Sequence, residues 1–190
     1  MSTITTTLAE YRRREGTNRL GLWLFLISDA FLFAGMFVSR FYLLGTGNRP
    51  EVSQSLGLAI TTLLLVSSYF MYTAETAMTF GETKKFFRSL LVTIVFGTLF
   101  LIGVVFVEWP MAGFNGSLET SIFFLMTGFH ALHVLTGVLF LFIVYRNAKK
   151  GLYSAERHWP VEAAAVYWHF VDVVWIFFYP ALYLIGRAAG

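Results

Sequence analysis

Five long apolar segments constrain the fold of this chain more than any other feature of its sequence. They cover residues 20–44, 55–80, 87–108, 120–145 and 163–185. Each is long enough to cross the hydrocarbon core of a membrane, which takes about 20 residues of helix. Only a helix satisfies its own backbone hydrogen bonds at that depth, and the segments lack the alternation of a membrane β-barrel. The sequence therefore predicts an all-α membrane protein, a bundle of five transmembrane helices.

The composition agrees with a lipid environment. Hydrophobic residues make up 57% of the 190 residues and charged residues only 13%, whereas a soluble domain is close to half apolar and about a quarter charged. The chain has no cysteine, which excludes disulfides, thiolate metal sites and iron–sulfur clusters. No basic patch is interleaved with aromatic residues, so no nucleic-acid partner is expected. The residues before the first apolar segment lack the core of a signal peptide, and we expect that segment to be retained as a helix.

Lysine and arginine predict the orientation of the bundle, because they are enriched in cytoplasmic loops. Of the 14 such residues, the side that holds the C-terminus has only Arg40, Arg49 and Arg187. We therefore expect a cytoplasmic N-terminus and an external C-terminus. Residues 1–19 would form a cytoplasmic N-terminal segment and residues 20–190 the five-helix transmembrane domain. Pro180 lies inside the last segment and is expected to kink it near its outer end.

Titratable side chains inside the apolar segments form an unusual pattern. A charged residue at the centre of a span costs about 3 kcal/mol on insertion scales and usually faces protein or water. The residues concerned are Asp29, Glu75, Glu108, His130, His133, Glu162, His169 and Asp172. His130 and His133 are three residues apart, as are His169 and Asp172, so each pair is expected on one helix face. We predict a polar seam inside the bundle, with Glu108 at its outer end.

This seam has a structural interpretation and a functional one. In the first, the polar groups hydrogen-bond one another and fix the packing of the helices. In the second, they handle protons or hold a cofactor. A haem with two axial histidines is one such cofactor, but HxxH places two imidazoles on one face and no second matching pair exists. Zinc bound by His130, His133 and His169 also stays open, although a buried structural zinc among five helices would be unusual.

Several segments resemble a known family. The stretch EAAAVYWHFVDVVWIFFYPALYLIG at residues 162–186 closely resembles the last helix of cytochrome c oxidase subunit III. TGFHALHVLTG at 127–137 resembles the helix before it, and GLWLFLISDAFLFAGMF at 21–37 resembles the family's helix with a buried acid. SSYFMYTAETA at 67–77 and the region of Glu108 fit the two helices between, in order. Full-length members have seven helices, so the chain is similar to the short five-helix bacterial form, whose missing pair can be fused to the catalytic subunit.

The resemblance implies a non-redox accessory subunit of a haem–copper terminal oxidase in aerobic respiration. In such a complex subunit I reduces oxygen to water and pumps protons, and subunit II receives electrons. Subunit III has no catalytic, cofactor-binding or metal site of its own, and haem and copper lie in its partners. It packs on subunit I, in a complex with subunit II and further small subunits. It also binds phospholipids and supports assembly, proton uptake and stable turnover. The implied location is the bacterial cytoplasmic membrane.

The resemblance also assigns positions to single residues. Asp29 matches the family's buried acid. The signature polar positions are matched by Glu108, His130, His133, Glu162, His169 and Asp172. Arg146, Lys149 and His158 resemble positions that hold lipid headgroups near the inner interface. Glu75 stands where many members carry histidine or an uncharged residue, and no role is assigned to it.

Three other functions stay open on the sequence alone. The small subunit that accompanies nitric oxide reductases is related to subunit III. A haem-binding membrane cytochrome would be coloured when purified, whereas a subunit III is expected to be colourless. An independent transporter is favoured by inverted repeats and broken helices, and neither stands out. The choice between cytochrome c and quinol as electron donor depends on another subunit.

Overall fold

The computed structural model describes residues 8–49 and 52–188 of the chain. In this part of the chain, five helices are long and apolar enough to cross a membrane, which confirms the predicted five-helix fold. Their bounds are α1 Leu8–Leu44, α2 Gln54–Thr79, α3 Thr83–Ile102, α5 Leu118–Lys149 and α6 Trp159–Tyr179. Short segments extend two of them, namely π-helical η1 Gly103–Glu108 and then α4 Trp109–Ala112 after α3, and π-helical η2 Pro180–Leu184 after α6.

Helix α1 begins before the apolar segment that predicted it. The prediction started at residue 20, whereas the helix starts at Leu8. Residues 10–15, EYRRRE, are mostly good helix formers, so the helix continues beyond the apolar stretch. The Tyr11 hydroxyl accepts a hydrogen bond from the backbone N–H of Trp159 at 3.0 Å. This polar extension therefore also contacts the start of α6.

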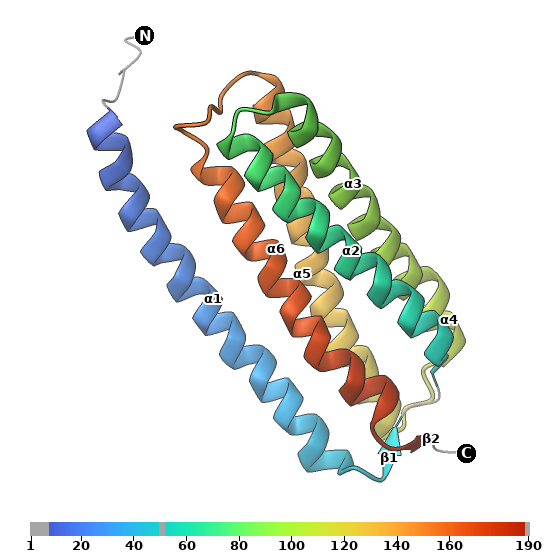
Figure 1. Cartoon of the computed structure of the whole chain (residues 1–190). Coiled ribbons are helices and arrows are strands. Elements are labelled where there is room, and N and C mark those ends of the chain that lie inside the picture. The colour runs from blue at the N-terminus through green and yellow to red at the C-terminus, as the bar shows by residue number, and fades with distance from the viewer. Residues whose placement is uncertain (1–7, 50–51, 189–190) are drawn as a thin grey trace.

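The helices form a four-helix bundle with one outlying helix (Figure 1). Helices α2, α3, α5 and α6 pack together, and α1 lies along one side of them, next to α6 and α5. In the most apolar stretch of α1 only 11% of the residues are buried, against 61% in α6. Helix α6 is therefore the centre of the molecule, and α1 exposes most of its surface.

Close packing in the bundle depends on glycines opposite Trp168. This tryptophan is fully buried and lies against Gly97 on α3 and Gly137 on α5. A Cβ atom at Gly137 would lie 3.0 Å from the indole ring, and one at Gly97 would overlap it. The two glycines let three helices approach one another closely, as small residues do in membrane bundles.

Pro180 disturbs the last span where the sequence predicted a kink. The α-helix ends at Tyr179, and the next turn, η2, is π-helical. The backbone N–H of Ile185 reaches the carbonyl of Pro180 at 3.0 Å. Proline has no N–H to donate and its ring crowds the preceding turn, so the regular α-helix is interrupted at this residue, and a π-helical turn follows it.

A buried arginine joins α1 to the end of the last span. Arg40 is fully buried and donates to the carbonyl of Gly45 at 2.7 Å, just after α1. It also donates to the carbonyls of Ala181 and Ile185, both at 3.1 Å. Carbonyl groups near helix ends lack partners within the helix, and Arg40 supplies donors to three of them.

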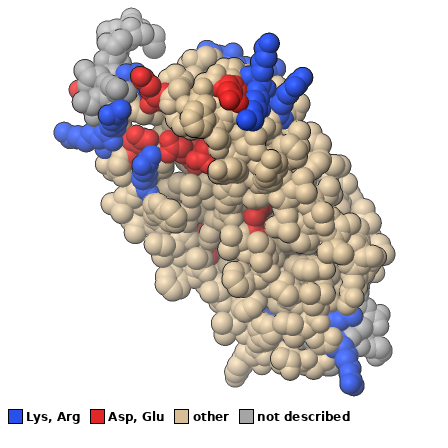
Figure 2. All heavy atoms as spheres, in the orientation of Figure 1, with Lys and Arg blue, Asp and Glu red and all other residues tan. Residues whose placement is uncertain are grey.

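The start of α1 and strand β2 lie at opposite ends of the bundle, as five crossings require (Figure 1). At the C-terminal end, the short strands β1 Asn48–Arg49 and β2 Arg187–Ala188 pair in parallel. Figure 2 shows most lysines, arginines and exposed acids at the N-terminal end, and a smaller basic group at the other. The predicted orientation rests on this distribution, and the sidedness itself stays a prediction.

Candidate functional site

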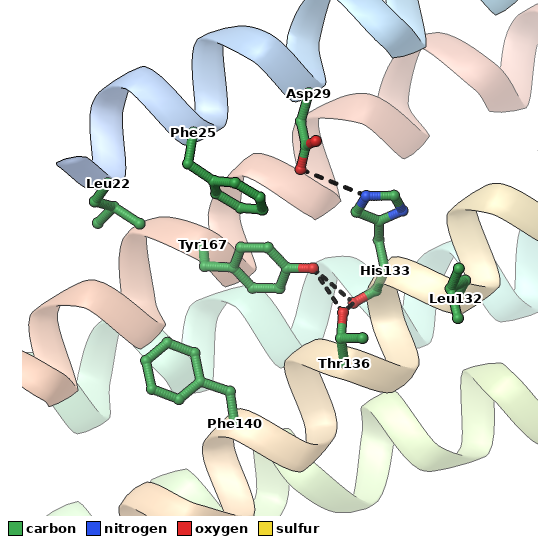
Figure 3. Close-up of a pocket in the computed structure, with 8 residues that line it drawn as sticks. All are labelled: Leu22, Phe25, Asp29, Leu132, His133, Thr136, Phe140 and Tyr167. Atoms are coloured by element: carbon green, nitrogen blue, oxygen red, sulfur yellow. Dashed lines mark hydrogen bonds and ion pairs between the residues drawn. The ribbon is translucent and has the colours of Figure 1, made fainter.

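A carboxyl group and an imidazole meet between α1 and α5, near the middle of the bundle (Figure 3). Oδ2 of Asp29 lies 3.5 Å from Nε2 of His133. Both side chains are largely buried, with 15% of Asp29 and 14% of His133 exposed. They line a pocket of about 380 Å³ together with Leu22, Phe25, Leu132, Thr136, Phe140 and Tyr167. The sequence singled out both titratable residues, and the structure brings them together from different helices.

A backbone hydrogen bond orients the ring of His133. Its Nδ1 lies 2.7 Å from the backbone oxygen of Phe129, and because a carbonyl oxygen only accepts, Nδ1 carries a proton. Nε2 is therefore the ring nitrogen that faces Asp29. A proton placed between these two groups, on the imidazole or on the carboxyl group, would leave the pair without net charge and would lower the cost of placing it at membrane depth.

Two hydroxyl groups that the sequence analysis did not single out complete the polar part of this pocket. The hydroxyl of Tyr167 lies 2.8 Å from that of Thr136. The two lie 3.1 and 2.9 Å from the backbone oxygen of His133, respectively (Figure 3). They hold the turn that carries the imidazole. The spacing of Thr136 from His133 is typical of a hydroxyl that bonds back to its own helix, but Tyr167 comes from α6 and only the packing reveals it.

A second polar group lies between α2 and α6. Nδ1 of His169 is 2.7 Å from the hydroxyl of Ser68. Asp172, one turn further along α6, is 3% exposed. The same Ser68 hydroxyl interacts with the Asp172 carboxyl group, although no hydrogen bond of ordinary geometry joins them. The two predicted residues of α6 thus share one neighbour, Ser68, which the sequence analysis missed.

His130 lies apart from these groups. It is fully buried, with its ring 4.7 Å from that of Trp175 and 5.6 Å from that of Phe100. Residues three apart differ by about 60° around a helix, which is enough to direct His133 toward α1 and His130 into the core. In the described part of the chain no three His, Asp or Glu side chains are grouped as a metal ion would require. The zinc site considered for His130, His133 and His169 therefore has no structural support.

Polar residues of α2 form a ladder against α6. They follow one another at intervals of seven residues, as Gln54, Thr61, Ser68 and Glu75. Seven residues make two helical turns, so the four share one face. Thr61 accepts a hydrogen bond from the indole N–H of Trp175 at 2.9 Å. Gln54 donates to the backbone oxygen of Tyr183 at 3.1 Å. Of this α2–α6 ladder only Glu75 belongs to the predicted seam, and the regular spacing of the other polar residues is the signal that could have revealed them.

An ionic cluster lies at the N-terminal end of the bundle. Glu162 is 2.8 Å from Arg19 on α1 and 3.4 Å from Nε2 of His158. Nδ1 of His158 lies 3.1 Å from the backbone oxygen of Ser154. Glu75, the last residue of the ladder, interacts electrostatically with both Glu162 and His158. Glu162 therefore joins α1 to α6 and brings several charges together at this end.

The three predicted lipid-headgroup residues lie at this same end. Arg146 and Lys149 are in the last turn of α5, and the ammonium group of Lys149 lies 4.9 Å from the ring centre of Tyr145. His158 is 8% exposed, so its contacts are mostly with protein. Headgroup binding by these residues stays a prediction.

Glu108 lies toward the other end of the seam. It is the last residue of η1 and is 1% exposed. Its Oε1 accepts a hydrogen bond from the hydroxyl of Tyr183. Its Oε2 has no hydrogen-bond partner among the described residues. The carboxyl group is therefore enclosed by the bundle and bonded to one phenol.

Comparison with known proteins decides the family. A family model described as cytochrome c oxidase subunit III matches residues 10–187. The chain belongs to the cytochrome c oxidase subunit III family. Among its relatives, cytochrome c oxidase subunit 3 of Thermostichus vulcanus is 34% identical over 175 residues, which cover 88% of this chain and 87% of the relative. The proteins of the same name from Halichoerus grypus and Dugong dugon are 35% and 36% identical over 182 residues, covering 88% of this chain and 69% of each relative.

Membership of the subunit III family makes the chain a subunit of an oxidase complex of the respiratory chain. The resemblance drawn from the WHFVDVVW stretch is thereby confirmed. The family and the five apolar helices together identify a multi-pass membrane protein. The matched region contains every residue of the polar seam. The seam is therefore a feature of a respiratory membrane subunit. Its side chains are buried or partly buried, and those of His130 and Asp172 have no hydrogen-bond partner of ordinary geometry among the described residues.

Proposed function

We propose that the chain is the non-redox accessory subunit III of a bacterial proton-pumping haem–copper oxidase. Haem and copper would lie in partner subunits, and this chain would pack on subunit I in a complex with subunit II. Membership of the family and similarity along most of the Thermostichus vulcanus protein support this assignment. We place the complex in the bacterial cytoplasmic membrane, with the strongly basic N-terminal end in the cytoplasm.

The contribution of the chain to the complex would be mechanical support. Among the described residues, polar contacts join α1 to the rest of the bundle at four positions, Tyr11, Arg19, Asp29 and Arg40. Little of α1 is buried between them, so much of its apolar surface is available to a neighbouring subunit. The observation that carries this proposal is the Asp29–His133 pair, because it sets the position of α1 at mid-depth.

Bound phospholipid would fill the spaces beside α1. Two apolar pockets of about 350 and 390 Å³ lie between α1 and α6, and aliphatic chains suit such walls. Arg146, Lys149 and His158 would hold headgroups at the N-terminal end, where they are near the membrane surface.

A role in proton uptake would belong to the ionic cluster at the same end. Glu75, His158 and Glu162 place three titratable groups close together. On the cytoplasmic side they would collect protons for the catalytic subunit. Proton uptake is then expected to be slower in a complex that lacks this chain, and equal uptake rates with and without it would remove this role.

The support role is tested by Asp29→Ala in the assembled oxidase. We expect initial oxygen reduction close to that of the unaltered complex, because Asp29 takes no part in the redox chemistry. Breaking a buried pair costs about 3–5 kcal/mol, so subunit III content or the duration of activity should fall. Oxygen consumption over time and quantitative subunit analysis measure these effects. Ser28→Ala is the control, since Ser28 is exposed and bonds only within α1. Immediate loss of the haem spectrum in a fully assembled variant would contradict the proposal.

The partner assignment is tested by co-purification. A tagged chain extracted in mild detergent is expected to bring down oxidase subunits I and II, identified by mass spectrometry. Recovery of nitric oxide reductase subunits instead, or of a solitary chain that carries haem, would overturn it.

A further inference from the structure

A buried phenol and a buried carboxyl group meet where the two π-helical segments of the described chain come together. Glu108 ends η1 and Tyr183 lies in η2. The hydroxyl of Tyr183 donates to Oε1 of Glu108, and the two residues are 0% and 1% exposed. π-Helical turns are rare and frequently occur at functional sites. Here two such turns, from different spans, hold one hydrogen bond in place.

This hydrogen bond provides Tyr183 with a base. Loss of an electron makes a phenol strongly acidic, so a tyrosine in an apolar interior is readily oxidised only where a hydrogen-bonded base accepts its proton. The other buried tyrosine of the described chain, Tyr167, contacts the hydroxyl of Thr136 and the backbone oxygen of His133. Neither group is a base that can keep the proton. Tyr183 is therefore the buried tyrosine that is equipped for oxidation coupled to proton transfer.

Other oxidisable rings lie next to Tyr183. The ring centre of Trp175 is 6.3 Å away, and that of Tyr179 is 5.1 Å away and nearly stacked, at 29°. The indole N–H of Trp175 donates to the hydroxyl of Thr61, which is not a base. An oxidised Trp175 therefore keeps its proton and remains able to take an electron from Tyr183. Tyr179 is half-buried and connects the group to the surface of the bundle.

We propose that Tyr183 is a redox-active tyrosine with Glu108 as its proton acceptor. A peroxide-derived one-electron oxidant takes one electron from Trp175, and the indole radical cation takes one electron from Tyr183. The phenolic O–H bond breaks as the proton moves to Oε1 of the Glu108 carboxylate. The products are the reduced oxidant, a neutral tyrosyl radical and a neutral carboxylic acid. A one-electron reductant at the membrane surface restores the phenol, which regains its proton from Glu108. The site would thus reduce one-electron oxidants that reach the bundle and hold the resulting radical on Tyr183 until it is reduced.

Flash oxidation of the purified full-length chain tests this proposal. Tris(bipyridine)ruthenium(III), generated by light and persulfate, serves as the one-electron oxidant, and electron paramagnetic resonance detects tyrosyl radicals. We expect the signal of the tyrosyl radical that is hydrogen-bonded to a carboxylic acid to disappear in Tyr183→Phe, because exposed tyrosines such as Tyr42 and Tyr69 give radicals in other environments. In Glu108→Gln, whose amide cannot hold the proton, we expect a yield about tenfold lower, equal to a barrier about 1.4 kcal/mol higher. Tyr42→Phe removes an exposed tyrosine and is expected to leave the signal unchanged.

Two results would overturn the proposal. An undiminished signal in Tyr183→Phe would assign the radical to another of the nine tyrosines. An undiminished yield in Glu108→Gln would remove the role of the carboxylate. Circular dichroism and gel filtration in detergent check that each variant folds. If a variant does not fold, the unaltered chain still tests the proposal by electron–nuclear double resonance. A protonated Glu108 must then appear as an exchangeable proton that is coupled to the tyrosyl radical. A radical without that coupling would also reject the proposal.

Discussion

The imidazole of His133 is held from two sides. Nδ1 faces the carbonyl of Phe129 at 2.7 Å, and Nε2 faces Asp29 at 3.5 Å. The carbonyl fixes one proton on the ring, and a second proton between Nε2 and Asp29 would make the pair neutral overall. A neutral pair costs less to bury than a lone charge, so the pairing lowers the cost of titratable groups at mid-depth between α1 and α5.

The pairing predicts that replacing His133 alone lowers the free energy of unfolding more than replacing both His133 and Asp29. His133→Leu alone leaves Asp29 without its partner and is expected to lower the free energy of unfolding by about 3–5 kcal/mol. The double variant Asp29→Leu with His133→Leu removes both groups and is expected to cost less than His133→Leu. Unfolding of the purified chain in denaturing detergent measures both. Costs that simply add in the double variant would contradict the coupling.

At the scale of the helices, the α2–α6 ladder specifies the alignment and rotation of α2 against the last span. Its hydroxyl and amide groups come from α2 at one spacing, and each bonds to a group on α6 or on η2, which continues the same span. Hydrophobic association supplies little specificity between helices in lipid, because lipid tails are as apolar as leucine. The ladder therefore supplies the specificity that apolar contacts lack.

Two neighbouring threonines of α2 test the ladder. In Thr61→Val the indole N–H of Trp175 loses its acceptor, and an unsatisfied buried donor costs about 1–3 kcal/mol. Thr62→Val is the matched control, because the hydroxyl of Thr62 is exposed and bonds only to the carbonyl of Leu58 in its own helix. Thermal unfolding should separate the two variants, and equal transition temperatures would show that the bond to Trp175 contributes nothing.

The sequence predicted the membrane-spanning helices well, but it predicted few of the contacts between them. The spans were predictable because solubility in lipid is a property of each segment alone. The extension of α1 to Leu8 was missed because its residues are polar. Pro180 signalled a disturbance where η2 begins, whereas the sequence analysis made no prediction for η1. Two features depend on how each helix is rotated against its neighbours: the separation of His130 from His133, and the contact of Tyr167 with the backbone of His133. The sequence of a single segment does not determine that rotation.

At the scale of the whole molecule, α1 stands apart from a compact four-helix bundle (Figure 1). Its polar contacts are spread along its length, at Tyr11, Arg19, Asp29 and Arg40. Much of its apolar surface remains uncovered. This arrangement suits a subunit that works inside a larger membrane complex.

The orientation of the molecule is testable because the natural chain has no cysteine. We expect Phe114→Cys, in an exposed loop near the C-terminal end, to react with a membrane-impermeant maleimide in intact cells. Lys84→Cys, at the exposed start of α3, should react only after the cells are permeabilised. The reverse pattern of labelling would show that the bundle is inserted the other way round.

Gln54, Thr61 and Ser68 lie seven residues apart on one face of α2. A displacement of α2 by a single turn along the last span would therefore break the hydrogen bonds of all three together. A misaligned bundle would then present several unsatisfied dipoles to oil rather than one. Because lipid offers these groups no hydrogen-bond partner, the bilayer disfavours a wrong alignment of the two helices by the summed cost of all of them.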